Sequence, residues 1–376
     1  MKIVRDRLRL AGALTLASGQ SLSEVDIAFE TYGALSPARD NAILLLHGLT
    51  ADQHAAGPPW HEKGRAGWWN QAIGPGRAID TDRFFVICPN VLGSFGGSTG
   101  PMSRDPATGR AYGMRFPVIT IADMVAAQRQ LIAALGIERL HAIVGGCMGG
   151  FQAFEWMSRH PECVGSAVVI SATARTNTHN TALWSVLRAA LMSDPAWNDG
   201  DYYDGPSPDA GLGLLAMTGA LFWMSREALH EKFGLRTIEN RPLRYTLEPE
   251  FAIEEFLARV RRNAGAGNLD ANALIYLTRA IDYFDLSREY DTVAEALARY
   301  TSPLLLVSYA TDWRYPSQEM NEIREALEPR SVPVRHEILD SPIGHGAFLY
   351  DFNGLEPILR TFLSGDFSGG RGDRPT

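Results

Sequence analysis

Cys147 has the sequence surroundings of a catalytic nucleophile. It lies in the glycine-rich run GGCMGG at 145–150, between an apolar, strand-like segment and a helix-like one. Gly145 and Gly149 leave room for a nucleophile elbow, the sharp strand-to-helix turn that presents a reactive side chain. Free N–H groups and partial positive charge at the helix N-terminus favour a thiolate there. The alternative is that Cys147 is a small buried residue on a glycine-rich turn.

Two residues far along the chain complete a candidate catalytic triad with Cys147. Asp312 follows the strand-like segment 303–308, and His345 follows the segment 332–339. The order nucleophile, acid, histidine, each just past a predicted strand, is typical of α/β-hydrolase triads. We therefore predict that His345 is the general base for the Cys147 thiol and that Asp312 fixes the histidine tautomer. The alternatives are a surface histidine and a turn carboxylate.

An oxyanion hole needs two backbone N–H groups directed at the developing negative charge. We predict that Met148, which directly follows the nucleophile, supplies one of them. The other is assigned to Leu49, because the run HGLT at 47–50 follows a predicted strand and is similar to the HG turn of α/β hydrolases.

The elements that must position these residues follow from short apolar, β-branched-rich segments. The predicted strands are 42–47, 84–88, 140–145, 164–171, 303–308 and 332–339. Helical stretches such as 122–135 and 149–160 lie between them, and this alternation predicts an α/β fold with a mostly parallel central sheet flanked by helices. The segment 24–31 is expected to add antiparallel pairing at one edge.

The alternation of strands and helices stops in the middle of the chain. Residues 172–299 are helical in pattern and rich in Met, Trp and Leu before strands resume. We predict that they form an inserted helical lid, with 1–171 and 300–366 as the core; a separate second domain is the alternative. The Gly/Ser-rich residues 367–376 are expected to be a disordered tail.

Composition excludes several classes of protein. The 376 residues contain 35 Lys+Arg and 43 Asp+Glu, and the formal charge of −8 lacks the basic excess of a nucleic-acid-binding protein. Three cysteines without metal-ligand spacing indicate no disulfide scaffold, no metal site and a reducing, cytoplasmic location. The first residues lack the long apolar core of a secretory leader and no apolar stretch reaches membrane-spanning length, so we expect neither secretion nor a membrane partner.

Long blocks of the sequence resemble the homoserine O-acetyltransferase family of α/β hydrolases. The matching blocks are 29–35, 47–57, 67–101, 116–128, 134–156, 200–217 and 269–286. The resemblance implies the α/β-hydrolase fold, the triad, and ping-pong transfer of an acyl group from acyl-CoA to a small hydroxyl acceptor. It also implies that no cofactor is bound and that two copies associate through their lids as a homodimer.

The sequence departs from the family pattern within the site itself. Family members carry Ser where Cys147 stands, an Asp where Gly346 stands, and an Arg that holds the acceptor carboxylate where Ala216 aligns. Arg175, Arg188 or Arg279 could supply a charge from elsewhere. Engineering of Cys147 is another explanation, although the departures at 216 and 346 argue against it. The candidate substrate-binding residues are Asn70, Tyr202, Tyr203, Ala216 and Gly346.

These observations predict an enzyme that forms an acyl-enzyme at Cys147 and passes the acyl group to a small hydroxyl or amine acceptor. An α-amino acid presents both a cation and a carboxylate, and each needs a partner once it is buried. Both family partners are replaced here, so we expect an acceptor other than homoserine. The alternatives are a hydrolase of a small ester, thioester or amide that uses the same triad, and a ligand-binding protein without catalysis.

Overall fold

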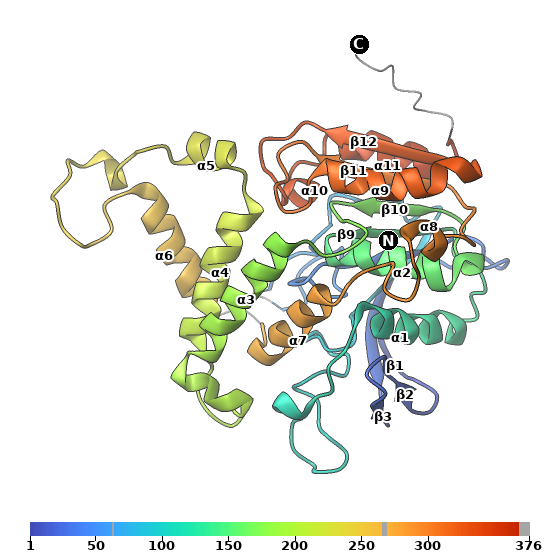
Figure 1. The fold of residues 1–376 in the computed structure, drawn as a ribbon, viewed down its shortest axis with the longest axis horizontal. Helices are drawn as coiled ribbons and strands as arrows, with labels where there is room; N and C mark the ends of the chain where they lie inside the picture. The colour runs from blue at the N-terminus through green and yellow to red at the C-terminus, as the bar shows by residue number, and fades with distance from the viewer. Residues whose placement is uncertain (62–63, 265–268, 368–376) are drawn as a thin grey trace.

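An eight-stranded sheet forms the centre of the molecule (Figure 1). The computed structural model describes residues 1–61, 64–264 and 269–367. In spatial order the strands are β1 (Ile3–Arg9), β4 (Asp26–Tyr32), β8 (Phe85–Pro89), β5 (Ala42–Leu46), β9 (Ala142–Gly146), β10 (Ala167–Ile170), β11 (Leu304–Tyr309) and β12 (Val334–Leu339). Two small pairs lie outside it: β2 (Leu14–Thr15) with β3 (Ser21–Leu22), and β6 (Ile73–Gly74) with β7 (Ile79–Asp80).

The pairing within the sheet confirms the predicted mostly parallel arrangement. From β8 to β12 all neighbouring strands are parallel, whereas β1 and β4 add antiparallel pairing at one edge. Strands β5, β9, β10 and β11 are buried along their whole length, as expected for continuous apolar segments covered on both faces. β1 was not among the predicted strands, because its burial and charge pattern is that of an exposed edge.

Every predicted core strand is present, with ends displaced by three residues at most. The largest displacement is at the start of β10, where the apolar segment begins at Val164 and the strand at Ala167. Leu140 and Val164 form an isolated parallel bridge, so pairing of these segments begins before the continuous ladder does. Hydrophobicity alone does not distinguish such a bridge from a strand.

Helices flank this sheet. The first helix of the core, α1 (Ile121–Ala134), begins with a capping box in which Thr120 and Asp123 each accept a backbone N–H of the other. Three further helices, α2 (Met148–Arg159), α9 (Ser317–Leu327) and α11 (Leu355–Leu363), follow strands β9, β11 and β12, with the short α10 (Ala347–Tyr350) before α11. The apolar face of α2 packs on β9 and β10, which places its N-terminus at the end of β9.

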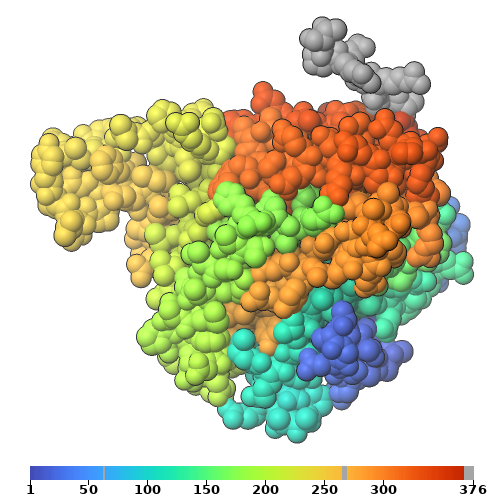
Figure 2. All heavy atoms as spheres, viewed as in Figure 1, coloured from blue at the N-terminus to red at the C-terminus, as the bar shows by residue number. Residues whose placement is uncertain are grey.

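A group of helices projects from one side of the sheet (Figure 1). The projecting part is formed between β10 and β11 by α3 (Thr178–Met192), α4 (Asp209–Trp223), α5 (Arg226–Lys232), α6 (Ala252–Ala264) and α7 (Ala271–Asp282), and the short α8 (Val293–Ala296) that follows packs against α9 of the core. They lie within the range 172–299 that we predict to be an insertion. The segment from α5 to α6 extends farthest from the sheet, as the yellow part of Figure 2 shows. Apart from Phe367, the predicted tail at 367–376 lies outside the described residues.

Candidate active site

The three members of the candidate triad meet at one edge of the sheet. Cys147 follows β9, Asp312 follows β11 and His345 follows β12, and these strands run in the same direction. Because the carboxyl ends of parallel strands lie at a common edge, residues almost 200 positions apart are brought together there. All three side chains are buried, with Cys147 only 4% exposed.

Backbone geometry at Cys147 is that of a nucleophile elbow. Its φ is +56° and its ψ is −124°, a conformation that residues with a side chain rarely adopt. A Cβ added at Gly145 would lie 2.2 Å from the carbonyl oxygen of Gly149, and one at Gly149 would lie 2.0 Å from the carbonyl oxygen of Leu46. The glycines are therefore required by the close approach of β5, β9 and α2, and they let the strained turn form at Cys147.

Asp312 and His345 form the second contact of the site. The Nδ1 atom of His345 lies 2.9 Å from Oδ2 of Asp312, and both side chains are fully buried. The other carboxylate oxygen of Asp312 accepts the backbone N–H groups of Arg314 and Tyr315. Burial opposes the charged form of Asp312, but the contact with His345, the N–H of Tyr315 and the positive charge of Arg314 hold the pKa of Asp312 below its usual value.

Cys147 and His345 stabilise each other's charged forms. Burial alone would raise the pKa of the Cys147 thiol, but the adjacent imidazolium of His345, with smaller contributions from Arg314 and the Met148 N–H, lowers it. Burial would likewise lower the pKa of His345, but the carboxylate of Asp312 and the thiolate of Cys147 raise it to about 9. The resting site therefore favours a thiolate beside an imidazolium, which is the reactive form of a cysteine nucleophile.

The two residues predicted to form the oxyanion hole lie beside the nucleophile. The Met148 backbone N–H, at the first position of α2, donates toward the sulfur of Cys147. Leu49 is buried, and it directly follows Gly48 in the sequence. A Cβ added at Gly48 would lie 3.8 Å from the Cβ of Cys147. The Met148 N–H thus borders the position at which an acyl carbon on the sulfur would stand, and the assignment of Leu49 stays a prediction.

Tyr202, Tyr203 and Asn70, three predicted substrate-binding residues, are engaged elsewhere in the protein. The hydroxyls of Tyr202 and Tyr203 both donate to Asp270, which caps the N-terminus of α7. Burial is the main reason that the pKa of each tyrosine is raised, so both remain neutral donors. Asn70 is exposed, and its side-chain oxygen accepts the N–H of Gly57.

The segment at the end of α4 covers the triad histidine. The Trp223 ring meets the His345 ring edge to face, with ring centroids 5.7 Å apart, and the Trp223 carbonyl accepts the N–H of Gly346. A Cβ at Gly346 would lie 3.2 Å from the Trp223 ring. Ala216 is half-buried on the same helix, about two turns before Trp223. Two of the three departures from the family pattern, at 216 and 346, therefore lie on α4 or contact it.

A buried cation that the sequence did not lead us to predict lies next to the triad. Arg314 is only 3% exposed, and its guanidinium lies over the rings of Trp184 and Tyr315 at 4.9 and 5.4 Å from their centroids. The Tyr315 ring in turn contacts the His345 ring at 5.1 Å between centroids. The sequence signal for this cation is its place two positions after the triad acid.

The three arginines considered as replacements for the missing family cation are all paired with carboxylates. Arg175 contacts Glu322 and Asp285, and both Arg188 and Arg279 contact Asp282. Each of the three guanidinium groups therefore already has a carboxylate partner within the chain.

A small cavity adjoins the turn that carries the nucleophile. It is lined by Leu45, Leu46, Gly48, Trp68, Trp69, Gly145, Gly146 and Phe348. The indole N–H of Trp69 donates to the Phe348 carbonyl, and that of Trp68 donates to the Asp52 carbonyl. These bonds satisfy the indole N–H groups, so the tryptophans contribute apolar ring surface to the walls of the cavity.

The described residues 1–61, 64–264 and 269–367 offer neither a metal site nor a membrane-spanning helix. They contain no cluster of His, Cys, Asp and Glu side chains suited to a metal ion. Among the same residues, no helix has both the length and the apolar character needed to cross a bilayer.

Comparisons with known families and proteins agree with this geometry. The family model described as alpha/beta hydrolase fold matches residues 41–352. Homoserine O-acetyltransferase of Methanohalobium evestigatum is 42% identical over 352 residues, covering 93% of this chain and 71% of the relative. Homoserine O-succinyltransferase of Magnetococcus marinus is 40% identical over 371 residues, covering 96% and 94% of the two chains.

Solved structures show the same similarity. Homoserine O-acetyltransferase from Bacillus anthracis superposes with a TM-score of 0.89 at 28% identity, covering 96% of this chain and 98% of that chain. Esterase E22 superposes with a TM-score of 0.86, also at 28% identity, with coverage of 96% and 100%. The chain is thus similar along nearly its whole length both to acyltransferases and to an esterase.

The charge pairing at Cys147 predicts an unusual pH dependence of alkylation. Because the His345 imidazolium lowers the pKa of Cys147, reaction with iodoacetamide should reach half its maximal rate at a lower pH than it does with an unperturbed cysteine. In His345→Ala, burial is no longer opposed by that charge, and the midpoint should move upward. Mass spectrometry of the peptide containing Cys147 measures the rate, and equal midpoints in the two proteins would contradict the ion pair.

The close approach of the Leu46 carbonyl to Gly149 predicts that two glycine-to-alanine substitutions have different effects on stability. Gly149→Ala should lower the free energy of unfolding by about 1–3 kcal/mol, because its Cβ meets the Leu46 carbonyl. Gly219→Ala on α4 is the matched control: nothing lies within 4 Å of its Cβ, and alanine is the better helix former. Denaturant titration compares the two, and a Gly149→Ala variant as stable as Gly219→Ala would refute the proposed packing.

Proposed function

This chain belongs to the homoserine O-acetyltransferase family of α/β hydrolases, and on that premise we propose that it transfers an acyl group through Cys147. Acyl-CoA acylates the sulfur, and a small hydroxyl or amine acceptor then takes the acyl group. His345 holds the proton that the leaving CoA thiol receives, and it later removes the acceptor's proton. Asp312 keeps His345 in the required tautomer, and no bound cofactor takes part.

The observation that carries this proposal is the triad geometry at a nucleophile elbow. Cys147 has the strained turn conformation, and the buried Asp312–His345 contact lies beside it. A thiolate attacks the acyl-CoA carbonyl and yields a thioester on the enzyme, and the N–H groups of Leu49 and Met148 stabilise the oxyanion. The thioester remains activated toward an amine, a hydroxyl or a thiol.

An acceptor other than homoserine is supported by what lies around His345. The family's Asp is replaced by Gly346, whose surroundings are the aromatic rings of Trp223 and Tyr350. A buried ammonium group at this position would therefore lack a carboxylate to compensate its charge. The three cysteines are free, which suits the cytoplasmic location that we propose for the enzyme.

Hydrolysis is the second candidate function, and the similarity to esterase E22 favours it. The same triad would acylate Cys147 and then activate water in place of an acceptor. The two functions differ in the second half of the reaction: transfer needs an added acceptor, and hydrolysis does not.

Intact-protein mass spectrometry tests acyl transfer directly. Brief incubation with acetyl-, propionyl- and succinyl-CoA should add one acyl mass to the wild-type protein and none to Cys147→Ala. Cys163→Ala is the control for another buried cysteine and should be acylated like the wild type. A persistent adduct that added acceptors discharge supports a transferase, and rapid loss in water supports the hydrolase. Absence of any adduct and of any turnover would refute both.

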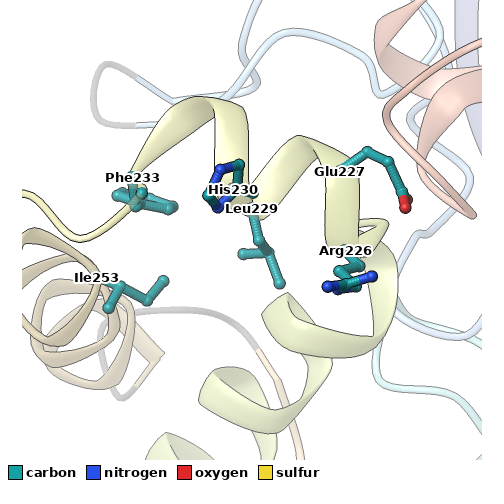
Figure 3. Close-up of a pocket in the computed structure, with 7 residues that line it drawn as sticks. Arg226, Glu227, Leu229, His230, Phe233 and Ile253 are labelled. Atoms are coloured by element: carbon teal, nitrogen blue, oxygen red, sulfur yellow. The ribbon is translucent and has the colours of Figure 1, made fainter.

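We further propose that two copies of the chain associate through the projecting helices. Leu235, Tyr245 and Leu247, between α5 and α6, are 87%, 92% and 107% exposed. Next to them, a groove is lined by Arg226, Glu227, Leu229, His230, Phe233, Gly234 and Ile253 (Figure 3). Large apolar side chains gathered at one projecting segment are typical of an interface rather than of a free surface.

Light scattering after size-exclusion chromatography tests this association. At micromolar concentration the wild-type protein should have twice its 41.2 kDa chain mass. The double substitution Leu235→Ser with Leu247→Ser should weaken the dimer by roughly tenfold or more, since buried anchor residues carry most interface energy. Met102→Ser changes an exposed apolar residue outside the projecting helices and should have no effect on the dimer. A monomeric wild type, or a double variant that dimerises equally well, would refute the lid interface.

A further inference from the structure

A tyrosine hydroxyl without a partner in the fold is buried beside the nucleophile. Tyr315, in the loop after β11, is 1% exposed, and within the part of the chain that the structure describes its hydroxyl makes no hydrogen bond of ordinary geometry. It faces the sulfur of Cys147 instead: burial, the charge of a Cys147 thiolate and a hydrogen bond to that thiolate raise the pKa of Tyr315 well above its ordinary value. Buried hydroxyls are nearly always bonded in folded proteins, so the sulfur is the acceptor that the fold leaves for this one.

Contacts with the triad and with α2 hold the Tyr315 ring in this position. Its backbone N–H donates to Oδ1 of Asp312, the carboxylate oxygen that does not face His345. Its ring packs against the His345 ring, with centroids 5.1 Å apart, and against the Phe151 ring, with centroids 5.7 Å apart. Phe151 lies in the first turn of α2, where its N–H donates to the Cys147 carbonyl. The contacts that assemble the triad therefore also place the hydroxyl of Tyr315.

Tyr315 differs from the other groups that act on the charge of Cys147. His345 and Arg314 act as positive charges, and the Met148 N–H is another neutral donor. His345 changes its charge during acyl transfer, because it gives a proton and later takes one. The Met148 N–H is the donor that we assign to the oxyanion. A hydroxyl keeps its proton throughout, so Tyr315 is available to stabilise negative charge on the sulfur at every step.

We propose that Tyr315 is a further catalytic residue, whose hydroxyl donates a hydrogen bond to the Cys147 thiolate before acylation and again when the thiolate leaves. The first part of this role concerns the free enzyme and needs no substrate. The second part deepens the proposed function and rests on it. The ring is held by contacts that a phenylalanine would keep, so the hydroxyl is the part of the side chain that this role requires.

The second half of the reaction is the step in which the hydroxyl acts on a leaving group. The acceptor's oxygen or nitrogen forms a bond to the acyl carbon, and the acceptor's proton passes to His345. When the tetrahedral intermediate collapses, the C–S bond breaks and its electron pair returns to the sulfur of Cys147. The O–H bond of Tyr315 stays intact while its hydrogen bond stabilises the new negative charge. A thiolate stabilised in this way is a better leaving group.

Alkylation of Tyr315→Phe by iodoacetamide tests the hydrogen bond, because this substitution removes only the hydroxyl. The pH at which Cys147 reacts at half its maximal rate should move upward, since the thiolate loses a donor. Below that pH the rate constant should fall by roughly threefold to tenfold. A hydrogen bond to a charged group changes the thiolate population by about tenfold to hundredfold, and the greater nucleophilicity of each remaining thiolate offsets roughly half of this on a logarithmic scale. Where the thiol is fully ionised, the rate should equal or exceed that of the wild type.

Tyr309→Phe is the matched control. Like Tyr315, Tyr309 on β11 is 1% exposed, and its hydroxyl has no partner among the residues that the structure describes. The charges that act on it are those of Asp351 and Asp312 rather than that of Cys147. Its alkylation profile should match the wild type, and both variants should be at least as stable in denaturant titration, since neither loses a hydrogen bond within the fold. An unshifted midpoint in Tyr315→Phe, an equal shift in both variants, or a marked loss of stability in Tyr315→Phe would overturn the proposal.

Discharge of an acetyl-enzyme tests the leaving step. Cys147 is acetylated with acetyl-CoA or with p-nitrophenyl acetate, hydroxylamine is added, and intact-protein mass spectrometry measures the rate at which the acetyl group is lost. This rate should fall by roughly threefold to tenfold in Tyr315→Phe and remain unchanged in Tyr309→Phe. A wild-type rate in Tyr315→Phe would refute the leaving-group role. If neither donor acetylates Cys147, acyl transfer fails, and the alkylation profile still decides whether Tyr315 binds the thiolate.

Discussion

The buried contact between Asp312 and His345 is the interaction on which the chemistry of this site depends. It joins the loops after β11 and β12, two adjacent parallel strands, at a point from which water is excluded. A carboxylate there is stable only because it accepts two backbone N–H groups and faces an imidazolium. That imidazolium then lowers the pKa of the Cys147 thiol. Loss of the contact would therefore remove the base and the thiolate together.

A second constraint is steric and concerns the backbone. Cys147 can stand at the tip of its turn because β5, β9 and α2 approach one another at glycines. This approach also places the first N–H of α2 beside the sulfur, so the turn, the oxyanion donor and the helix dipole have one structural origin. Any side chain at Gly145 or Gly149 would separate these elements and disturb all three at once.

Much of this arrangement could be predicted from the sequence, because it is encoded locally. A continuous apolar segment predicts a buried strand, and the spacing of glycines around Cys147 predicts the elbow. Asp312 and His345 follow from their places just after such segments, since parallel strands end at a common edge. Strand β1 was missed because its charged, exposed pattern resembles a polar N-terminal segment.

Contacts between distant elements could not be predicted in this way. Tyr202 and Tyr203 lie in a family-like segment, yet their hydroxyls meet Asp270, nearly 70 residues later. The surroundings of Arg314 could not be predicted, because its guanidinium stacks on Trp184, which lies on a helix 130 residues earlier in the chain. Whether an arginine is paired or free is decided by the tertiary structure, and neither its neighbours in sequence nor its hydropathy contains that information.

The charges around Cys147 explain how one site could serve both halves of a transfer reaction. Before acylation the thiolate keeps His345 protonated, and this proton is the one that a leaving thiol requires. Once the sulfur carries an acyl group its negative charge is gone, and the reason for His345 to remain protonated is weakened. The imidazole can then act as the base for the acceptor. Asp312 keeps its contact with His345 throughout, so the role of His345 changes without any rearrangement of the triad.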